Sequence, residues 1–138
     1  MAGEMPSAFD WPVRVYYEDT DAGGIVFYAN YLKFFERART EWLRAAGIAQ
    51  QALLDAEGAG FVVKSAQLDY HAPARLDDEL NIRTTVEKLG RASVQFAQQA
   101  WRGDTLLTSA IVKVGCVDLA SMRPRSLPEH VADKMRAA

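Results

Sequence analysis

The residues best placed to do chemistry lie in one short segment around Asp21. Before it, residues 13–17 alternate apolar and polar positions as in a half-buried strand, and after it the apolar spacing becomes that of a helix. A tight bend at Gly23 and Gly24 would therefore bring the Asp21 carboxylate to a helix start. The first N–H groups of a helix have no internal acceptor and carry partial positive charge. A carboxylate beside such donors suits acyl chemistry, in which a polarised thioester carbonyl is attacked.

Each group of this segment has an expected role. Asp21 would attack the carbonyl and form an acyl-aspartyl anhydride, or it would take a proton from an attacking water. The backbone N–H groups near Tyr28 and Ala29 would polarise the thioester oxygen, and Gly24 lets the backbone approach a ligand without a Cβ in the way. The structural alternative for Asp21 is a cap at the helix start. Asp19 is expected to be the structural carboxylate that fixes the turn.

Three helices are predicted. Apolar side chains recur every three or four positions over residues 30–46, with charged side chains between them, which indicates an amphipathic helix. Gly47 is placed to end it. A shorter helix is predicted over residues 50–57, and a short one that frays over residues 129–138.

Four further runs alternate with period two, as strands do: residues 61–72, 80–89, 92–102 and 106–117. Gly90-Arg91 and Gly103-Asp104 separate the last three, which predicts antiparallel hairpins. With the strand at 13–17 this makes five strands and one long helix. Residues 123–128 should be extended, because each proline disfavours helix in the residue before it. We expect a single domain over residues 1–138, with its core at about 13–118.

Composition argues against several classes of function. Sixteen basic and eighteen acidic residues leave a net charge of −2, which gives no electrostatic case for binding nucleic acid. No apolar run approaches the ~20 residues of a spanning helix, so we expect no membrane insertion and a cytoplasmic location. Cys116 lies in an apolar run and is expected to be buried, and the two histidines are too far apart in sequence to suggest a metal site. No metal and no cofactor is predicted.

The motif D-T-D-A-G-G-I-V-F-Y-A-N-Y over residues 19–31, followed by F-E-R-A-R over 35–39, resembles the 4-hydroxybenzoyl-CoA thioesterase family of hotdog-fold proteins. The closest likeness is to the Tol-Pal-associated acyl-CoA thioesterase branch. Later anchors are F-V-V-K over 61–64 and Y-H-A-P-A-R-L-D-D over 70–78. The resemblance implies an α+β hotdog fold, in which a five-stranded antiparallel sheet wraps around one long helix.

The resemblance also implies roles for single residues. Asp21 matches the family's catalytic aspartate. Tyr28 stands where the nearest branch commonly has histidine, and the tyrosine instead resembles the 4-hydroxybenzoyl-CoA enzyme itself. The alternative for Tyr28 is simple packing. Arg91 matches a position where relatives place a basic residue on the CoA phosphates, and the alternative is a solvated turn arginine. We also predict substrate contacts from Ser93, Val26 and Tyr31, although aromatic side chains at helical spacing ordinarily pack the core.

Two more features have a structural interpretation that we prefer. His71 would be the base of a hotdog dehydratase, but the longer signature of those enzymes is absent, so we expect it to line or border the cleft. Glu36, Arg37 and Arg39 are expected to form a solvated charged face. The alternative is that Glu36 holds a water, a partner residue or Arg39 across a subunit interface.

The resemblance implies an enzyme that hydrolyses acyl-CoA to a carboxylic acid and CoA. The acyl group would be short-chain aliphatic or aromatic. Hotdog proteins form their sites between two protomers, so we expect a homo-oligomer, a dimer or a homotetramer. A functional link to the Tol-Pal envelope system is also implied. The alternatives are a hotdog hydratase or dehydratase and a noncatalytic acyl-binding or envelope-associated scaffold module.

Overall fold

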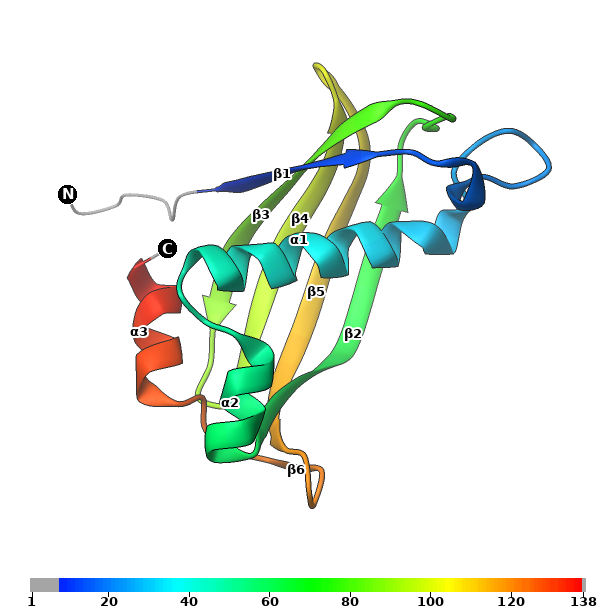
Figure 1. Cartoon of the computed structure of the whole chain (residues 1–138). Helices are drawn as coiled ribbons and strands as arrows, with labels where there is room; N and C mark the ends of the chain where they lie inside the picture. Colours follow the sequence, from blue (N-terminus) through cyan, green and yellow to red (C-terminus); the bar gives the residue numbers. More distant parts are fainter. Residues whose placement is uncertain (1–7, 138) are drawn as a thin grey trace.

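The structure is a computed structural model that describes residues 8–137. Its largest element is a curved antiparallel sheet (Figure 1). The sheet has five long strands in the order β1-β3-β4-β5-β2. They are β1 (Phe9–Arg14), β2 (Ala59–Tyr70), β3 (Glu79–Leu89), β4 (Ser93–Arg102) and β5 (Thr105–Asp118). A two-residue strand, β6 (Arg123–Pro124), pairs with β5. The predicted α+β arrangement of one long helix and five strands is confirmed, and β6 is an addition to it.

Local sequence accounts for the turns and the curvature of the sheet. The two predicted hairpins are confirmed: β3 pairs with β4 and β4 with β5, both antiparallel. The turn between β4 and β5 needs Gly103, whose φ is +56°. β2 has a register shift between Val63 and Ser65, and such bulges bend a strand. Gly115 of β5 leaves the room that the Lys64 side chain occupies, because a Cβ at Gly115 would lie 2.8 Å from Lys64 Cδ.

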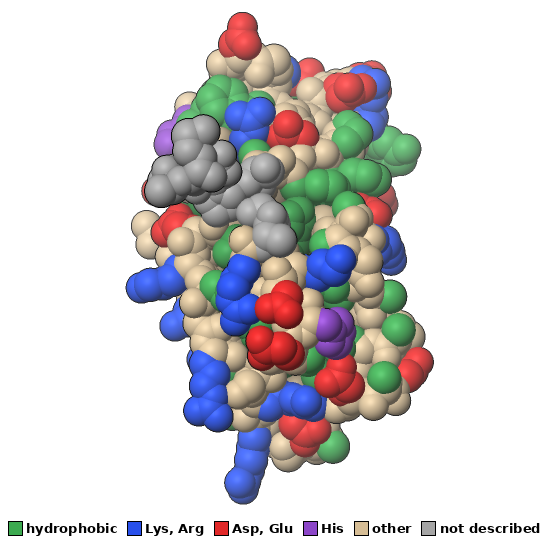
Figure 2. All heavy atoms as spheres, turned by 90° about the vertical axis from the view of Figure 1, so that its left-hand side faces the viewer, with side chains coloured by type: hydrophobic (Ala, Val, Ile, Leu, Met, Phe, Trp, Pro, Cys, Tyr) green, Lys and Arg blue, Asp and Glu red, His purple; other side chains and the backbone are tan. Residues whose placement is uncertain are grey.

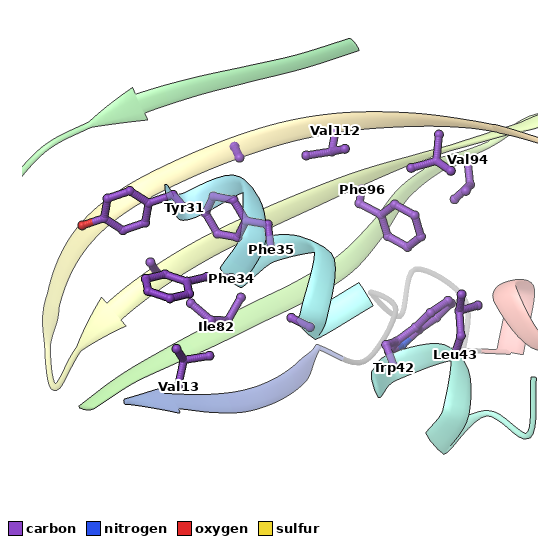
Figure 3. Packing of buried hydrophobic residues seen from close by; sticks show 14 of the residues in the cluster. Val13, Tyr31, Phe34, Phe35, Trp42, Leu43, Ile82, Val94, Phe96 and Val112 are labelled. Carbon is purple, nitrogen blue, oxygen red and sulfur yellow. The ribbon is translucent and has the colours of Figure 1, made fainter. Parts of the chain in front are cut away.

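Helix α1 (Tyr31–Ala45) crosses one face of the sheet, and the core lies between them (Figures 1 and 3). Phe34 and Phe35 of α1 are fully buried. Trp42, two turns further on, meets Phe96 of β4 edge to face, with ring centroids 5.7 Å apart. The helix ends at Gly47, whose φ of +84° is the left-handed conformation expected of a stop. The predicted amphipathic helix is confirmed to within a residue at each end.

The smaller elements also follow the prediction. Helix α2 (Gln50–Glu57) ends at Gly58, and helix α3 (Glu129–Ala137) follows the segment with two prolines. Cys116 is buried, as expected for a small apolar side chain. Within residues 8–137, no helix is long and apolar enough to span a bilayer.

A buried polar network links α1 to the sheet. Arg39 Nη1 donates to Gln98 Oε1 of β4 at 2.9 Å. Gln98 Nε2 donates in turn to the carbonyl oxygen of Phe35 at 3.0 Å and to Thr84 Oγ1 of β3 at 2.9 Å. Arg39 is 9% exposed, so its predicted place on a solvated charged face is wrong. The helical repeat puts Arg39 on the same side as Phe35, four positions before it, and the sheet supplies the acceptor that makes burial tolerable.

The first strand was predicted too late in the chain. β1 covers Phe9–Arg14 rather than residues 13–17, and a 3-10 turn, η1 (Tyr17–Asp19), follows it. The apolar alternation continues to Val15, which is buried although it lies outside the strand, so burial periodicity alone misplaces the end. The carboxylate of Asp19 stops the strand, because Oδ2 accepts the backbone N–H of Tyr16 at 2.8 Å and turns the chain.

Asp19 also ties this turn to the start of the helix. Its Oδ1 accepts Asn30 Nδ2 at 2.9 Å, and its carbonyl oxygen accepts the backbone N–H of Phe27 at 3.0 Å. Asp19 is 5% exposed and Asn30 is also buried. The structural role predicted for Asp19 is therefore confirmed.

The Gln98→Leu variant should lose about 3 kcal/mol of unfolding free energy. The change keeps the volume but leaves the Arg39 guanidinium buried without its acceptor. Urea unfolding at one fixed protein concentration measures it. Gln51→Leu on the exposed side of α2 is the control and should stay within about 0.5 kcal/mol of the parent protein. A loss below about 1 kcal/mol for Gln98→Leu would mean that the network does not hold the helix.

The Asp19→Asn variant should lose about 1 to 2 kcal/mol, because the amide has one acceptor where the carboxylate uses two, and its NH₂ group would face another donor. Thermal unfolding followed by circular dichroism checks this. Asp21→Asn, two residues away and exposed, should melt within a degree or two of the parent protein. Equal losses in the two variants would contradict the structural role of Asp19.

Candidate active site

Asp21 lies on a narrow loop whose ends are joined by a bridge between Thr20 and Val26. Its backbone N–H donates to the carbonyl oxygen of Ile25 at 2.9 Å. Its Oδ1 accepts the N–H of Gly23 at 2.8 Å, and a Cβ at Gly23 would lie only 3.1 Å from that oxygen. Gly24 has a φ of +78°, which only glycine adopts without strain. The glycines therefore shape a loop that presents an exposed carboxylate to solvent.

The other side of the loop runs into the helix start. A 3-10 turn, η2 (Tyr28–Asn30), leads directly into α1, and Asn30 N–H donates to the carbonyl oxygen of Phe27 at 2.8 Å. Within residues 8–137, the N–H groups of Tyr28 and Ala29 make no hydrogen bond. The helix start thus has two N–H donors free for a ligand, because the first N–H groups of a helix have no acceptor within the helix.

A cleft of about 280 Å³ opens beside this helix start. Three predicted residues, Val26, Tyr28 and Tyr31, line it together. The opposite wall comes from the end of β2 and the residues after it, and the full lining is Ile25, Val26, Tyr28, Tyr31, Tyr70, His71, Ala72 and Pro73. Residues 25–31 and 70–73 are far apart in sequence, so the fold alone brings these walls together.

Tyr70 joins the two walls, although no separate role was predicted for it. Its hydroxyl donates to the carbonyl oxygen of Tyr28 at 2.8 Å. Its ring meets Tyr28 edge to face at 6.3 Å and Tyr31 at 5.7 Å between centroids. Burial raises the pKa of both Tyr31 and Tyr70, so both phenols stay neutral and act as hydrogen-bonding aromatic walls. In the sequence, Tyr70 was marked only by its place next to His71 in the motif over residues 70–78.

His71 borders this cleft, as predicted, and is exposed. Its Nε2 lies 3.0 Å from Ser109 Oγ, so its described partner is a hydroxyl and not a carboxylate. A dehydratase base is ordinarily oriented by a carboxylate, and this contact does not supply one. Within the described part of the chain, no three His, Cys, Asp or Glu side chains gather as they would around a metal ion.

Arg91 and Ser93 lie at the end of the sheet opposite to the Asp21 loop. Within one protomer they are therefore far from Asp21. β1 and β3 pair so that Arg14 lies opposite Glu79, which puts the Asp21 loop at the start of β3 and the Arg91 turn at its end (Figure 1). The eleven residues of β3 span about 35 Å. The carbonyl oxygen of Ser93 accepts the N–H of Gly90 at 2.8 Å and shapes the turn.

Arg91 lines a separate cleft of about 430 Å³ between this turn and α3. Its Nε donates to Ser126 Oγ at 2.8 Å, and within residues 8–137 its terminal nitrogens make no hydrogen bond. The cleft also has Arg136 and Glu129 in its lining. Figure 2 shows Lys and Arg side chains lying beside Asp and Glu side chains on the face turned to the viewer, so this face is of mixed charge.

Comparison with known proteins shows which family the chain resembles in sequence and fold. The thioesterase superfamily model matches residues 23–109, which include Gly23 and Gly24, α1 and the end of β2. The acyl-CoA thioesterase YbgC of Haemophilus influenzae is 49% identical over 127 residues, which is 92% of this chain and 93% of that protein. The acyl-CoA thioester hydrolase YbgC of Escherichia coli O6:H1 is 50% identical over 129 residues, 93% of this chain and 96% of that protein.

The fold agrees with these matches. The crystal structure of a probable thioesterase from Bartonella henselae superposes with a TM-score of 0.85 at 34% identity, covering 88% of this chain and all of that one. The family model covers more than half of the chain, and the two curated relatives cover nearly all of it. On this sequence and structural likeness, the chain belongs to the thioesterase superfamily.

Proposed function

We propose that the protein hydrolyses acyl-CoA thioesters to a carboxylic acid and CoA at the start of α1. The observation that carries this proposal is the pair of free N–H donors at Tyr28 and Ala29, beside a loop that presents the Asp21 carboxylate. Two relatives at about half identity are named as acyl-CoA thioesterases, which supports the substrate class.

In the proposed reaction the thioester oxygen accepts hydrogen bonds from Tyr28 and Ala29, which stabilise the negative charge that develops on it. Asp21 then acts by one of two routes. In the first, its carboxylate attacks the carbonyl carbon, CoA leaves as the thiolate, and water cleaves the acyl-aspartyl anhydride. In the second, the carboxylate takes a proton from a water that attacks directly, and the tetrahedral intermediate expels the same thiolate. Both routes give the free acid and CoA.

The acyl group is proposed to occupy the cleft lined by Val26, Tyr28 and Tyr31. The walls are mostly apolar, and Tyr28, Tyr31 and Tyr70 are among the residues that line them. A cleft of about 280 Å³ suits a short aliphatic or an aromatic acyl group. Tyr28 is 64% exposed in one protomer, so its ring is available to a ligand.

The site is proposed to be completed by a second protomer. β2 is an edge strand, and its outer backbone groups are unpaired within the described chain. Val63 on this strand is 54% exposed, and an exposed edge of twelve residues is a template for pairing with another chain. The end of β2 also forms one wall of the cleft, so a copy paired along β2 would border the site.

CoA is proposed to reach Arg91 of a neighbouring protomer. Within one chain the Arg91 turn is the length of β3 away from Asp21, so a single protomer does not offer both to one substrate. The free end of the guanidinium suits a phosphate, which it binds with two parallel hydrogen bonds. The nearby Glu129 weakens the attraction, so the contribution should be modest.

Other functions and properties expected from the sequence remain predictions. A noncatalytic acyl-binding module would bind acyl-CoA without releasing thiol, and a hydratase would require His71. The cytoplasmic location, the homotetramer and the link to the Tol-Pal envelope system are likewise predictions.

Asp21→Asn should lower kcat at least about a hundredfold with KM little changed, because the amide neither attacks nor takes a proton. A free-thiol assay over a panel of acyl-CoAs measures it. His71→Ala is the control against the hydratase alternative and should leave hydrolysis largely intact. A folded Asp21→Asn variant that releases CoA at nearly the parent rate would show that the carboxylate only shapes its loop.

Arg91→Ala should raise KM for acyl-CoA roughly tenfold, since a partly exposed charged hydrogen bond contributes about 1 to 2 kcal/mol. The matching pantetheine thioester lacks the nucleotide and should be insensitive to the change. Equal losses on both substrates would mean that Arg91 acts through the structure of its turn.

The purified protein should be a dimer or a larger homo-oligomer by light scattering. Val63→Lys, on the exposed edge of β2, should weaken the assembly and the activity together, because edge lysines oppose strand pairing. A parent protein that is monomeric and still turns over substrate would rule out a site shared between protomers.

A further inference from the structure

The hydroxyl of Tyr70 contacts one particular peptide unit at the helix start. It donates to the carbonyl oxygen of Tyr28 at 2.8 Å. That oxygen belongs to the peptide unit between Tyr28 and Ala29, which also carries the Ala29 N–H. A trans peptide unit is planar, and its C=O and N–H point in opposite directions. A donor that fixes this carbonyl oxygen therefore also fixes the direction of the Ala29 N–H, which is turned away from Tyr70.

The preceding peptide unit is held in a similar way by the backbone. The Tyr28 N–H shares its unit with the carbonyl oxygen of Phe27, and this oxygen accepts the N–H of Asn30 at 2.8 Å. Asn30 is buried, and its side chain donates to Asp19. Each of the two free donors at the helix start thus belongs to a peptide unit whose carbonyl oxygen is held. A local backbone contact holds the unit of the Tyr28 N–H, whereas a side chain from the end of β2 contacts the unit of the Ala29 N–H.

The position of Tyr70 is set by the sheet and by the core. The end of β2 is tied to β5, because the N–H groups of His71 and Ala72 both donate to the carbonyl oxygen of Leu107, at 2.7 and 3.2 Å. The ring of Tyr70 meets that of Tyr31, which is 3% exposed and packed in the core. A tyrosine has few side-chain torsions, so these contacts leave its hydroxyl little freedom. Burial also raises the pKa of Tyr70, so the phenol keeps the proton that it donates.

We infer that Tyr70 is a positioning residue for thioester hydrolysis, which orients and polarises the Ala29 N–H through the carbonyl oxygen of Tyr28. The inference rests on the proposed function, in which this N–H binds the thioester oxygen. Hydrogen bonds in a chain strengthen one another, so a carbonyl oxygen that accepts one makes the N–H of its own unit a better donor. A 3-10 turn such as η2 has poorer backbone hydrogen-bond geometry than an α-helix, so a side-chain donor matters more there. Tyr70 acts through this peptide unit and does not touch the reacting atoms.

A single resonance reports on this peptide unit in the full-length protein without substrate. Tyr28-Ala29 is the only tyrosine–alanine pair in the sequence, so protein labelled with ¹³C-carbonyl tyrosine and ¹⁵N-alanine gives one HNCO cross-peak, from their shared unit. Tyr70→Phe removes the hydroxyl and keeps the ring, and it should shift this cross-peak in the carbonyl and amide dimensions. Tyr17→Phe removes the same group from a side chain that is 83% exposed, and it should leave the cross-peak in place. A cross-peak that Tyr70→Phe does not move would overturn the inference.

Kinetics with acyl-CoA separate the hydroxyl of Tyr70 from its ring. Tyr70→Phe should lower kcat roughly tenfold with KM little changed, because the Ala29 N–H stabilises charge that develops in the transition state. Tyr70→Leu, which also removes one wall of the cleft, should raise KM as well. Tyr17→Phe should leave both constants unchanged. A Tyr70→Phe variant with the parent kcat would show that Tyr70 is only a wall, and a lower kcat without a shift of the HNCO cross-peak would show that the hydroxyl contacts the substrate directly. Either result would overturn the inference.

The infrared carbonyl band of a bound thioester distinguishes a failure of this inference from a failure of the proposed function. An acyl-CoA with a ¹³C-labelled carbonyl is bound to Asp21→Asn and to the double variant that also carries Tyr70→Phe. The band should be shifted from its frequency in water in Asp21→Asn, and the added Tyr70→Phe should return it part of the way. A shifted band that Tyr70→Phe leaves unchanged would overturn the role of Tyr70 and leave the proposed function standing. A band at the water frequency in Asp21→Asn itself would overturn the proposed function and, with it, this inference.

Discussion

The position of α1 on the sheet depends on one buried guanidinium that must meet one buried amide. Apolar contacts along a helix are non-directional and would tolerate a small slide, but the Arg39 to Gln98 hydrogen bond would not. Gln98 is fully buried and also bonds the Phe35 carbonyl oxygen of the same helix and Thr84 of the next strand. A slide of one turn would leave several buried polar groups unsatisfied at once. The contact therefore holds α1 in place on the sheet, and with it the two free N–H donors at the helix start.

Two carboxylates close together in sequence divide the work at that helix start. Asp19 is buried, and both of its oxygens bind donors that hold the turn against Asn30. Asp21 is exposed, and its described contact is to the N–H of Gly23 in its own loop. A group whose hydrogen-bonding capacity is spent on structure makes a poor nucleophile, whereas one in a glycine loop keeps an oxygen free. Burial thus separates the structural carboxylate from the proposed catalytic one.

Local patterns predicted most of the fold. The long helix, the short helix before Gly58 and the two hairpins depend on periodicity and glycine, which neighbouring residues determine. The first strand was misplaced because Val15 continues the apolar alternation after the strand has ended at Arg14. Arg39 was misplaced because its acceptor, Gln98, is fifty-nine residues away in sequence. A local sequence pattern does not predict a hydrogen-bond partner that is so distant in sequence.

The site was predictable to a similar extent. The motif around Asp21 could be read from the sequence, and Val26, Tyr28 and Tyr31 do line one cleft. The role of Tyr70 depends on a contact between the end of β2 and the helix start, and only the fold creates it. Arg91 and Ser93 were predicted to bind substrate from their positions in the sequence, but strand pairing puts them at the opposite end of the sheet from Asp21. Distances across a sheet follow from its register, which the order of motifs along the chain does not give.

The central claim is that the N–H groups at the start of α1 polarise the thioester carbonyl. The most direct test is isotope-edited infrared difference spectroscopy of an acyl-CoA with a ¹³C-labelled carbonyl, bound to the Asp21→Asn variant. Two hydrogen bonds from backbone donors should move the carbonyl stretch to a lower frequency than that of the same thioester in water. A band at the frequency found in water would contradict the account, because the carbonyl would then lie away from the helix start.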